Sequence, residues 1–338
     1  MDEEKIYDII SIGDATQDNF LFVDEASVLC DKNDEHCKLM LDYGAKIPVS
    51  RFEQSLGGNA ANTGVGVARL GLSTALLTVL GNDDRATWIF DNLTSEGIDL
   101  DLVEFDERRS NFSSIINFKG ERTILVYHEP GHDFEGEIPQ TKWIYLTSST
   151  GVDSASMYGR VLEAATKQNI KISFNPGTTE CKKGGEHLRN VFEKCEVVVV
   201  NKEEAEWLVS NNESRIMSYG EDKNKYMSEL LKVLHSFGQK MTIITNGVDG
   251  AWGFDGTKKY HLPIMEVPIV EPTGAGDSFS AAITAALFYG KEMTEAMRWG
   301  MVNSASVVGK VGATPGLLSR EKVEEVLKNE AELKAVEI

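Results

Sequence analysis

Short apolar runs of strand length alternate along this chain with longer stretches that have helical periodicity. The predicted strands span residues 7–12, 75–80, 143–146, 171–174, 197–200 and 241–245. The predicted helices span residues 59–71, 86–96, 155–168, 227–237, 278–289, 293–308 and 320–334. Strands that alternate with helices build right-handed βαβ units, in which helices cover both faces of a parallel sheet. The alternation therefore predicts a three-layer α/β/α fold with a mostly parallel central sheet.

Glycine and polar residues follow several of these strands. They stand at 13–14, 175–176, 201–204 and 246–247. The carboxyl ends of parallel strands meet at one edge of a sheet, and the ligands of open α/β sheets bind there. We therefore expect these residues to gather in one ligand site.

Residues 1–338 are expected to form a single domain, because no linker rich in proline, glycine or serine divides them. Two β-rich pieces, about 19–56 and 108–127, lack helices and interrupt the alternation. We expect both pieces to leave the sheet edge and to pair into a small second sheet over the active face. A lid of this kind would exclude water from a transfer reaction.

The first of these pieces contains an acidic segment, residues 24–42, whose function the sequence does not indicate. Its acidic side chains fall near the spacing of a calcium-binding EF-hand loop. However, His36 stands where such a loop needs glycine, and Asp42 stands where it has glutamate. A solvated excursion is the better interpretation.

The composition limits the partners of this chain. A net charge of −19 disfavours nucleic acid, because phosphate neutralisation needs a basic surface. No apolar run approaches the roughly 18 residues of a membrane-spanning helix, and the acidic start at 1–5 is unlike a signal peptide. We therefore expect a cytoplasmic protein without membrane contact. In the absence of any CxxC spacing, free thiols are expected at Cys30, Cys37, Cys181 and Cys195.

The stretch at 272–279 is the most informative for chemistry. The β-favouring run at 264–270 before it predicts a strand, and a helix of small and apolar residues follows. Glycine and alanine at 274–276 would let the backbone approach a ligand, and the first N–H groups of the helix would bind an anion. Asp277 would repel a phosphate, but it is well placed to take a proton from an attacking hydroxyl. The alternative is an ordinary capped helix with Asp277 as a first-turn acid.

A second glycine-rich stretch, 56–71, combines Gly57 and Gly58 with a run of small residues. The two glycines allow a sharp turn, and Asn59 could cap the helix that starts there. A hint of the GxGxxG motif lacks its third glycine, and no strand leads into it. A dinucleotide-binding site is therefore rejected.

The chain resembles the ribokinase-like, PfkB-type family of carbohydrate and nucleoside kinases through two turns. These are Gly57-Gly58-Asn59-Ala60-Ala61-Asn62 and Thr273-Gly274-Ala275-Gly276-Asp277. The resemblance runs from the strand at 6–12 through the helix at 293–308. It implies a ribokinase-like fold with a small β-sheet lid, and a kinase that uses ATP and Mg²⁺.

The resemblance also implies roles for individual residues. Asp277 matches the catalytic base that deprotonates the acceptor hydroxyl. The backbone N–H groups of Gly274, Ala275 and Gly276 match the anion hole that holds the transferring phosphoryl group. The positions that match contacts to the acceptor are Asp14, Asp18, Gly57, Gly58, Asn59 and Asn62.

On the nucleotide side, Asn201 and Glu204 match a pair that organises Mg²⁺ and the phosphates, with the metal held through water. The alternative is a helix capped by Asn201 with an exposed Glu204. Glu271 departs from the family, which usually has an aspartate there as a ligand of a monovalent cation. A K⁺ site at Glu271, completed by carbonyls of 308–312, is therefore in doubt. The other implied nucleotide contacts are Thr245, Gly247, Gly250 and Asn303.

The acceptor is less well defined. Arg122 lies in a predicted hairpin, where it could contact a charged acceptor, but a lone arginine there is more often a surface residue. No basic cluster lies near Gly57 to indicate a phosphorylated sugar, so a neutral hydroxyl acceptor is favoured. We expect a ribose- or fructose-type sugar, and an adenosine-type nucleoside is the alternative. A non-catalytic sugar- or nucleotide-binding protein is a third interpretation. The lid could pair two copies in a homodimer, although the acidic segment could block such pairing.

Overall fold

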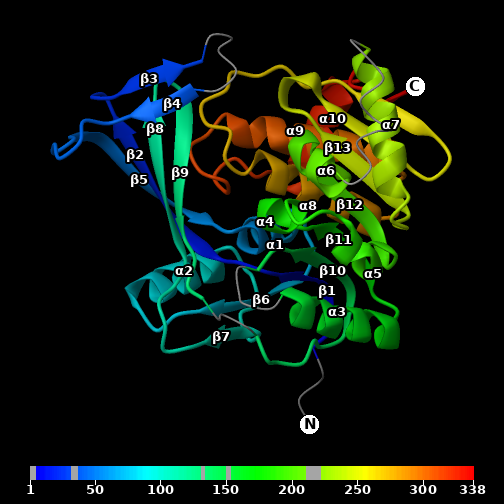
Figure 1. The fold of residues 1–338 in the computed structure, drawn as a ribbon. Helices are drawn as coiled ribbons and strands as arrows, with labels where there is room; N and C mark the ends of the chain where they lie inside the picture. The colour runs from blue at the N-terminus through cyan, green and yellow to red at the C-terminus, as the bar shows by residue number, and fades with distance from the viewer. Residues whose placement is uncertain (1–4, 32–36, 131–133, 150–153, 211–221) are drawn as a thin grey trace.

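The computed structural model describes residues 5–31, 37–130, 134–149, 154–210 and 222–338. A large central sheet lies between two layers of helices, and a smaller sheet stands beside them (Figure 1). The predicted three-layer α/β fold with a small second sheet is thus confirmed. Within the described residues, no helix is both long and apolar enough to pass through a bilayer.

In the described part of the chain, the central sheet has ten strands in the order β16-β15-β14-β13-β12-β11-β10-β1-β6-β7. Its parallel strands are β1 (Tyr7–Ile12), β6 (Thr74–Leu80), β7 (Val103–Phe105), β10 (Thr141–Thr147), β11 (Lys171–Asn175), β12 (Cys195–Asn201) and β13 (Met241–Thr245). Except in the edge strand β7, residues on both faces of these strands are buried, which explains their apolar runs. In β12, for example, Val198 and Val200 join the core on one face, whereas Val197 and Val199 join it on the other.

Helices form a layer on each face of this sheet (Figure 1). The layer around the C-terminal helices comprises α1 (Asn59–Arg69), α2 (Asp84–Ser95), α8 (Ala275–Phe288), α9 (Met293–Val308) and α10 (Arg320–Asn329). The opposite layer comprises α3 (Ser154–Gln168), α4 (Gly177–Cys181), α5 (Arg189–Phe192), α6 (Lys202–Leu208) and α7 (Lys223–His235). Short 3₁₀ turns lie at Glu186–Leu188 and Gly247–Asp249.

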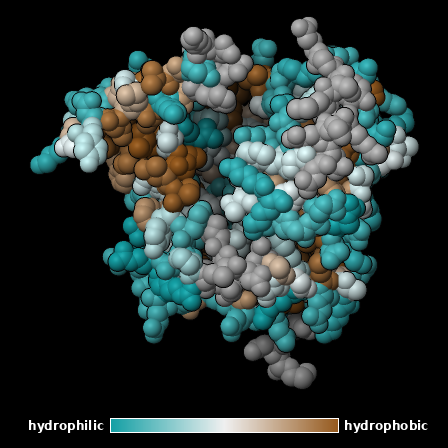
Figure 2. All heavy atoms as spheres, viewed as in Figure 1, coloured by the Kyte–Doolittle hydropathy of each residue, from teal (hydrophilic) through white to brown (hydrophobic). Residues whose placement is uncertain are grey.

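The small sheet consists of four strands in the order β5-β2-β8-β9. Its strands are β2 (Thr16–Val23), β5 (Val49–Gly57), β8 (Phe112–Phe118) and β9 (Glu121–Tyr127). The parallel pairing of β2 with β8 joins the two β-rich pieces of the sequence. The small sheet carries a surface of apolar side chains, seen in brown at the upper left of Figure 2. Leu125 and Phe52 contribute to it and are 55% and 54% exposed.

A disulfide bond in the acidic segment corrects one prediction. The strands β3 (Ser27–Cys30) and β4 (Cys37–Met40) form an antiparallel pair in which Cys30 and Cys37 lie opposite each other and are bonded. The free thiols expected at these two positions are therefore wrong, because hairpin register joins cysteines that no spacing motif marks. Cys181 and Cys195 are free and buried, as expected. The core of the EF-hand-like spacing, residues 32–36, lies outside the described residues.

Another correction concerns the strand predicted at 264–270, which the structure does not contain. These residues run without strand pairing from β15 to the start of α8. Proline at 263 and 268 removes backbone donors from this stretch, which disfavours a strand inside a sheet. The sequence also missed the antiparallel edge of the central sheet. That edge consists of β14 (Ala251–Phe254), β15 (Lys259–Leu262) and β16 (Val336–Glu337).

Candidate active site

A cleft of about 550 Å³ opens between the small sheet and the carboxyl ends of the central strands. Residues from both of the glycine-rich turns line it, together with residues that follow β11 and β12. Most of the predicted site residues thus reach one cavity. Those that line it are Asp14, Asp18, Gly58, Asn59, Asn62, Asn201, Glu204, Thr245, Gly274, Ala275, Gly276 and Asp277.

Asp277 lies in the first turn of α8 and faces α1 at the wall of the cleft. Its Oδ2 accepts a hydrogen bond from Asn62 Nδ2 at 2.8 Å, so the two predicted turns are in direct contact. Burial raises the pKa of Asp277 to about 7. The Asn62 hydrogen bond opposes this shift, and the charges of Glu204 and Asp18 add to it. A carboxyl group that titrates near neutrality is matched to a general base.

The side-chain oxygen of Asn62 is also informative. Asn62 Oδ1 is buried and has no hydrogen-bond partner among the described residues. A buried acceptor of this kind normally finds a donor, because leaving it unpaired costs about 1–3 kcal/mol. A hydroxyl group bound in the cleft next to Asp277 would supply that donor.

The turn before Asp277 requires glycine at position 274. Gly274 has a φ of 80°, and a Cβ at this position would lie 2.4 Å from the Cβ of Ala313. The turn is closed by a hydrogen bond from the Ala275 N–H to the Pro272 carbonyl, at 3.3 Å. The first N–H groups of α8 therefore start at the cleft wall, where the helix dipole favours an anion.

Two glycines let the Asp18 side chain and the Asp14 backbone pack against the other turn. A Cβ at Gly57 would lie 2.3 Å from the carboxyl group of Asp18, and one at Gly58 would lie 2.5 Å from the Asp14 carbonyl. Asp18 is buried, and this burial raises its pKa to about 6. Hydrogen bonds from the hydroxyls of Ser113 and Thr16 oppose the shift, whereas the charge of Glu271 adds to it.

The structure corrects the capping role predicted for Asn59. The N-cap of α1 is Gly58, and Asn59 is the first helical residue. The Asn59 Nδ2 instead donates to Thr147 Oγ1, at 3.3 Å, at the end of β10. Asn59 still lines the cleft, because the tight turn at Gly58 moves the helix start by one residue.

Asn201 and Glu204 form a capping box at the start of α6. Asn201 Oδ1 accepts from the Glu204 N–H at 2.8 Å, and Glu204 Oε2 accepts from the Asn201 N–H at 3.1 Å. Glu204 is nevertheless buried at the cleft wall, where burial raises its pKa. The alternative with an exposed Glu204 is therefore wrong, although its capping part is correct.

A second cavity, of about 620 Å³, lies on the other side of the turn and is mostly apolar. Thr245, Gly247 and Gly250 line it, and it shares Ala275 and Gly276 with the first cleft. The misassigned stretch at 264–270 forms one of its walls, since its side chains face the cavity rather than a neighbouring strand. The apolar members of that wall are Ile264, Met265, Val267 and Ile269.

Asn303, like Gly57 and Glu271, is a predicted site residue outside the lining of both cavities. It is fully buried. Its Nδ2 donates to the Ser278 carbonyl at 2.9 Å, and its Oδ1 accepts from the Leu318 N–H at 3.0 Å. Asn303 therefore links α8 to the segment before α10. The prediction that Asn303 contacts the nucleotide is corrected.

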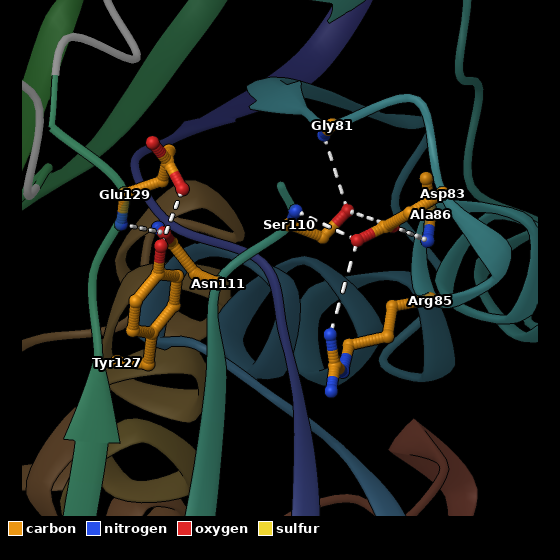
Figure 3. Close-up of polar contacts among 8 residues, drawn as sticks. All are labelled: Gly81, Asp83, Arg85, Ala86, Ser110, Asn111, Tyr127 and Glu129. Atoms are coloured by element: carbon orange, nitrogen blue, oxygen red, sulfur yellow. Dashed lines mark hydrogen bonds and ion pairs between the residues drawn. The ribbon is translucent and has the colours of Figure 1, made fainter. Parts of the chain in front are cut away.

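The base of the small sheet is anchored to the body of the molecule by polar contacts (Figure 3). Asp83 caps α2 and also accepts from the N–H and the hydroxyl of Ser110, just before β8. Asn111 Oδ1 accepts from the Glu129 N–H at 2.8 Å, just after β9. The two connections between the β8–β9 hairpin and the body of the molecule are thus fixed to it and to each other.

Several cleft residues were not found from the sequence. They come mainly from the small sheet, whose inward side chains become identifiable only when its pairing is known. Arg122 is the clearest case, since it lines the cleft rather than the predicted surface. The others include Ser113, Ile115, Ile124 and Val126.

Comparisons with known proteins identify relatives of this chain. The sequence model described as pfkB family carbohydrate kinase matches residues 17–320. A relative from Archaeoglobus fulgidus, named as an uncharacterized sugar kinase, is 27% identical over 265 residues. That match covers 75% of this chain and 98% of the relative.

Two solved structures share the fold. Ribokinase of Arabidopsis thaliana, complexed with ribose and ATP, has a TM-score of 0.76 at 20% identity, covering 96% of this chain and 99% of that one. A nucleoside kinase of Methanocaldococcus jannaschii has a TM-score of 0.72 at 20% identity, covering 96% of this chain and 98% of that one. At these identities the likeness establishes the fold alone.

Proposed function

Because the chain belongs to the pfkB family of carbohydrate kinases, we propose that it transfers the γ-phosphoryl group of ATP to a hydroxyl of a small ribose- or fructose-type sugar. The observation that carries this proposal is the contact between Asn62 and Asp277, which places a carboxyl group with a pKa near 7 beside a helix N-terminus. A site that only bound a ligand would not need a base at this position.

Each part of the turn has a role in the proposed transfer. Asp277 takes the proton of the acceptor hydroxyl as its oxygen attacks the γ-phosphorus. The bond between that phosphorus and the leaving ADP oxygen breaks as the new one forms. The N–H groups at 274–276 stabilise the negative charge of the phosphoryl oxygens, and the small sheet keeps water out of the cleft.

The apolar cavity is proposed to hold the adenine ring. It adjoins the turn at Ala275 and Gly276, so a nucleotide lying in it would direct its phosphates toward the N-terminus of α8. The ATP bound by the Arabidopsis ribokinase supports this choice of donor.

The residues present fit Mg²⁺ but not K⁺. Mg²⁺ usually keeps several waters and binds mainly through substrate phosphates, and Glu204 would hold it through water at the cleft wall. Bound Mg²⁺ would neutralise charge on the transferring phosphates.

The Glu271 carboxylate already has other partners, because it accepts two hydrogen bonds from Thr273 and faces the Arg122 side chain. A guanidinium group there leaves no role for a second cation.

The acceptor is proposed to be neutral and rich in hydroxyl groups. Asp14, Asp18 and Asn62 offer oxygens and an amide that suit vicinal hydroxyls, whereas the charge of Arg122 is directed to Glu271. A nucleoside is the alternative acceptor, because Ile115, Ile124 and Val126 add an apolar wall that could accept a base.

A coupled assay of ADP release over neutral sugars, phosphorylated sugars and nucleosides tests the proposal. We expect the highest kcat/KM with a neutral ribose- or fructose-type sugar. A preference for nucleosides would replace the sugar by the alternative acceptor. No turnover with any acceptor, combined with saturable binding of one, would overturn the kinase in favour of a binding protein.

A further inference from the structure

A buried carboxylate stands immediately before the turn that starts α8. Glu271 is only 2% exposed. Its Oε1 accepts from the Thr273 hydroxyl at 2.6 Å, and its Oε2 accepts from the Thr273 N–H at 3.0 Å. The Val308 carbonyl accepts the Glu271 N–H at 3.1 Å. These contacts set the direction in which the backbone enters Gly274.

A carboxylate this far from water is costly unless a cation faces it. The cation comes from the small sheet, where Arg122 of β9 places its Nε 3.6 Å from Glu271 Oε1. The Arg122 side chain is 28% exposed, so the ion pair is only partly screened by solvent. The contact links the small sheet directly to the turn of the proposed phosphoryl site.

Arg122 lies near the end of β9 that is away from the anchored base of the small sheet. Arg122 pairs with Asn117 near the hairpin turn, whereas Tyr127 pairs with Phe112 at the anchored base of the sheet. The base is held through Asn111 and Glu129 (Figure 3). The ion pair therefore acts at the end of β9 opposite to its base, so β9 is held at both ends across the cleft.

We propose that Arg122 is a positioning residue that couples closure of the small sheet to alignment of the 274–277 turn. When the sheet is closed, Arg122 neutralises Glu271 and keeps its carboxylate on Thr273. When the sheet swings away, Glu271 loses its cation and the clamp on Thr273 weakens. This inference rests on the proposed function of the turn in phosphoryl transfer.

Steady-state kinetics of Arg122→Met, Arg122→Lys and Arg51→Met test the coupling. Arg122→Met removes the cation but keeps the apolar stem, and we expect kcat to fall about 10- to 100-fold with the KM for ATP changed less than about 3-fold. Arg122→Lys keeps a point charge and should recover kcat to within about 5-fold of wild type. Arg51 lies on β5 of the same sheet and is exposed, so Arg51→Met should retain wild-type kcat.

Two further kinetic results decide the mechanism. The double variant Arg122→Met with Glu271→Gln should be no slower than Arg122→Met alone, because both changes break one interaction. An increase confined to the KM of the acceptor would show that Arg122 contacts the acceptor and would overturn the proposal. So would a lower Tm with unchanged kcat, since that is the result of a purely structural role.

Hydrogen exchange without substrates provides a readout that does not depend on the reaction. In Arg122→Met we expect exchange at least about 3-fold faster than wild type both in β9 and at 270–276, with Arg51→Met unchanged. Faster exchange in β9 alone would contradict the coupling. If no acceptor were turned over, the proposed function would fail, and this measurement would still decide whether Arg122 links the two segments.

Discussion

At the scale of single residues, replacing Asp277 with asparagine separates its two candidate roles, catalytic base and first-turn helix acid. The amide has nearly the same shape but cannot accept the proton of the acceptor, so we expect kcat to fall by at least about 100-fold. ATP affinity, measured by calorimetry, should change less than about 3-fold. The matched control is Asp84→Asn, because Asp84 is a first-turn acid of α2. Equal kcat in the two variants would refute the base assignment.

The hydrogen bond from Asn62 predicts a specific pH dependence. The base must be ionised, and burial raises the pKa of Asp277 to about 7. The value of kcat/KM should therefore fall about tenfold per pH unit below pH 7 and level off above it. Asn62 stabilises the ionised form, so Asn62→Leu raises the pKa further and moves the acid limb to higher pH, by about one unit.

The measurement is kcat/KM from about pH 5 to 9 in both proteins, with Asn92→Leu as the control. Asn92 lies on α2 and its side chain donates to the Trp88 carbonyl of its own helix, so its replacement should leave the profile unchanged. An acid limb near pH 4 in the wild type, or an identical limb in Asn62→Leu, would contradict the assignment.

At the scale of elements, the turn that starts α8 should tolerate alanine at one glycine and not at the other. Gly274 combines a positive φ with a close approach to Ala313, whereas a Cβ at Gly276 meets nothing within 4 Å. We therefore expect Gly274→Ala to lower the Tm by several degrees and kcat by at least about 100-fold. Gly276→Ala should keep the wild-type Tm, measured by differential scanning calorimetry. Equal Tm values would mean that the turn relaxes without strain.

The sequence correctly predicted the elements that depend on residues close to one another in the chain. The turns at Gly57 and Gly274 are encoded by glycines and by the helix that follows each, so both could be found before any contact was known. The run at 264–270 was misassigned because β-favouring residues also suit a cavity wall. Arg122 and the Cys30–Cys37 bond were missed because their partners depend on strand register and sheet packing. The predictions that failed are therefore those that depend on strand register and on packing between segments, which residue types alone do not encode.

At the scale of the whole molecule, the small sheet leaves a strand edge and an apolar face uncovered in the described chain. β9 is one of the two edge strands of this sheet, and its residues alternate between the cleft and the opposite face. Arg122, Ile124 and Val126 line the cleft, so Leu125 points away from it and is 55% exposed. Exposed edges with apolar side chains favour pairing with another copy.

We therefore propose a homodimer that forms through the outer face of the small sheet. Sedimentation equilibrium should give about twice the 37.3 kDa of the chain. Leu125→Glu would bury a charge in that interface and should give the monomer mass at the same concentration. Val336→Glu is the matched control, because Val336 is 60% exposed on β16. This strand is an edge of the central sheet and does not belong to the small sheet. A wild-type monomer at about 50 µM, or a Leu125→Glu dimer, would contradict this interface, and the small sheet would then act only within its own chain.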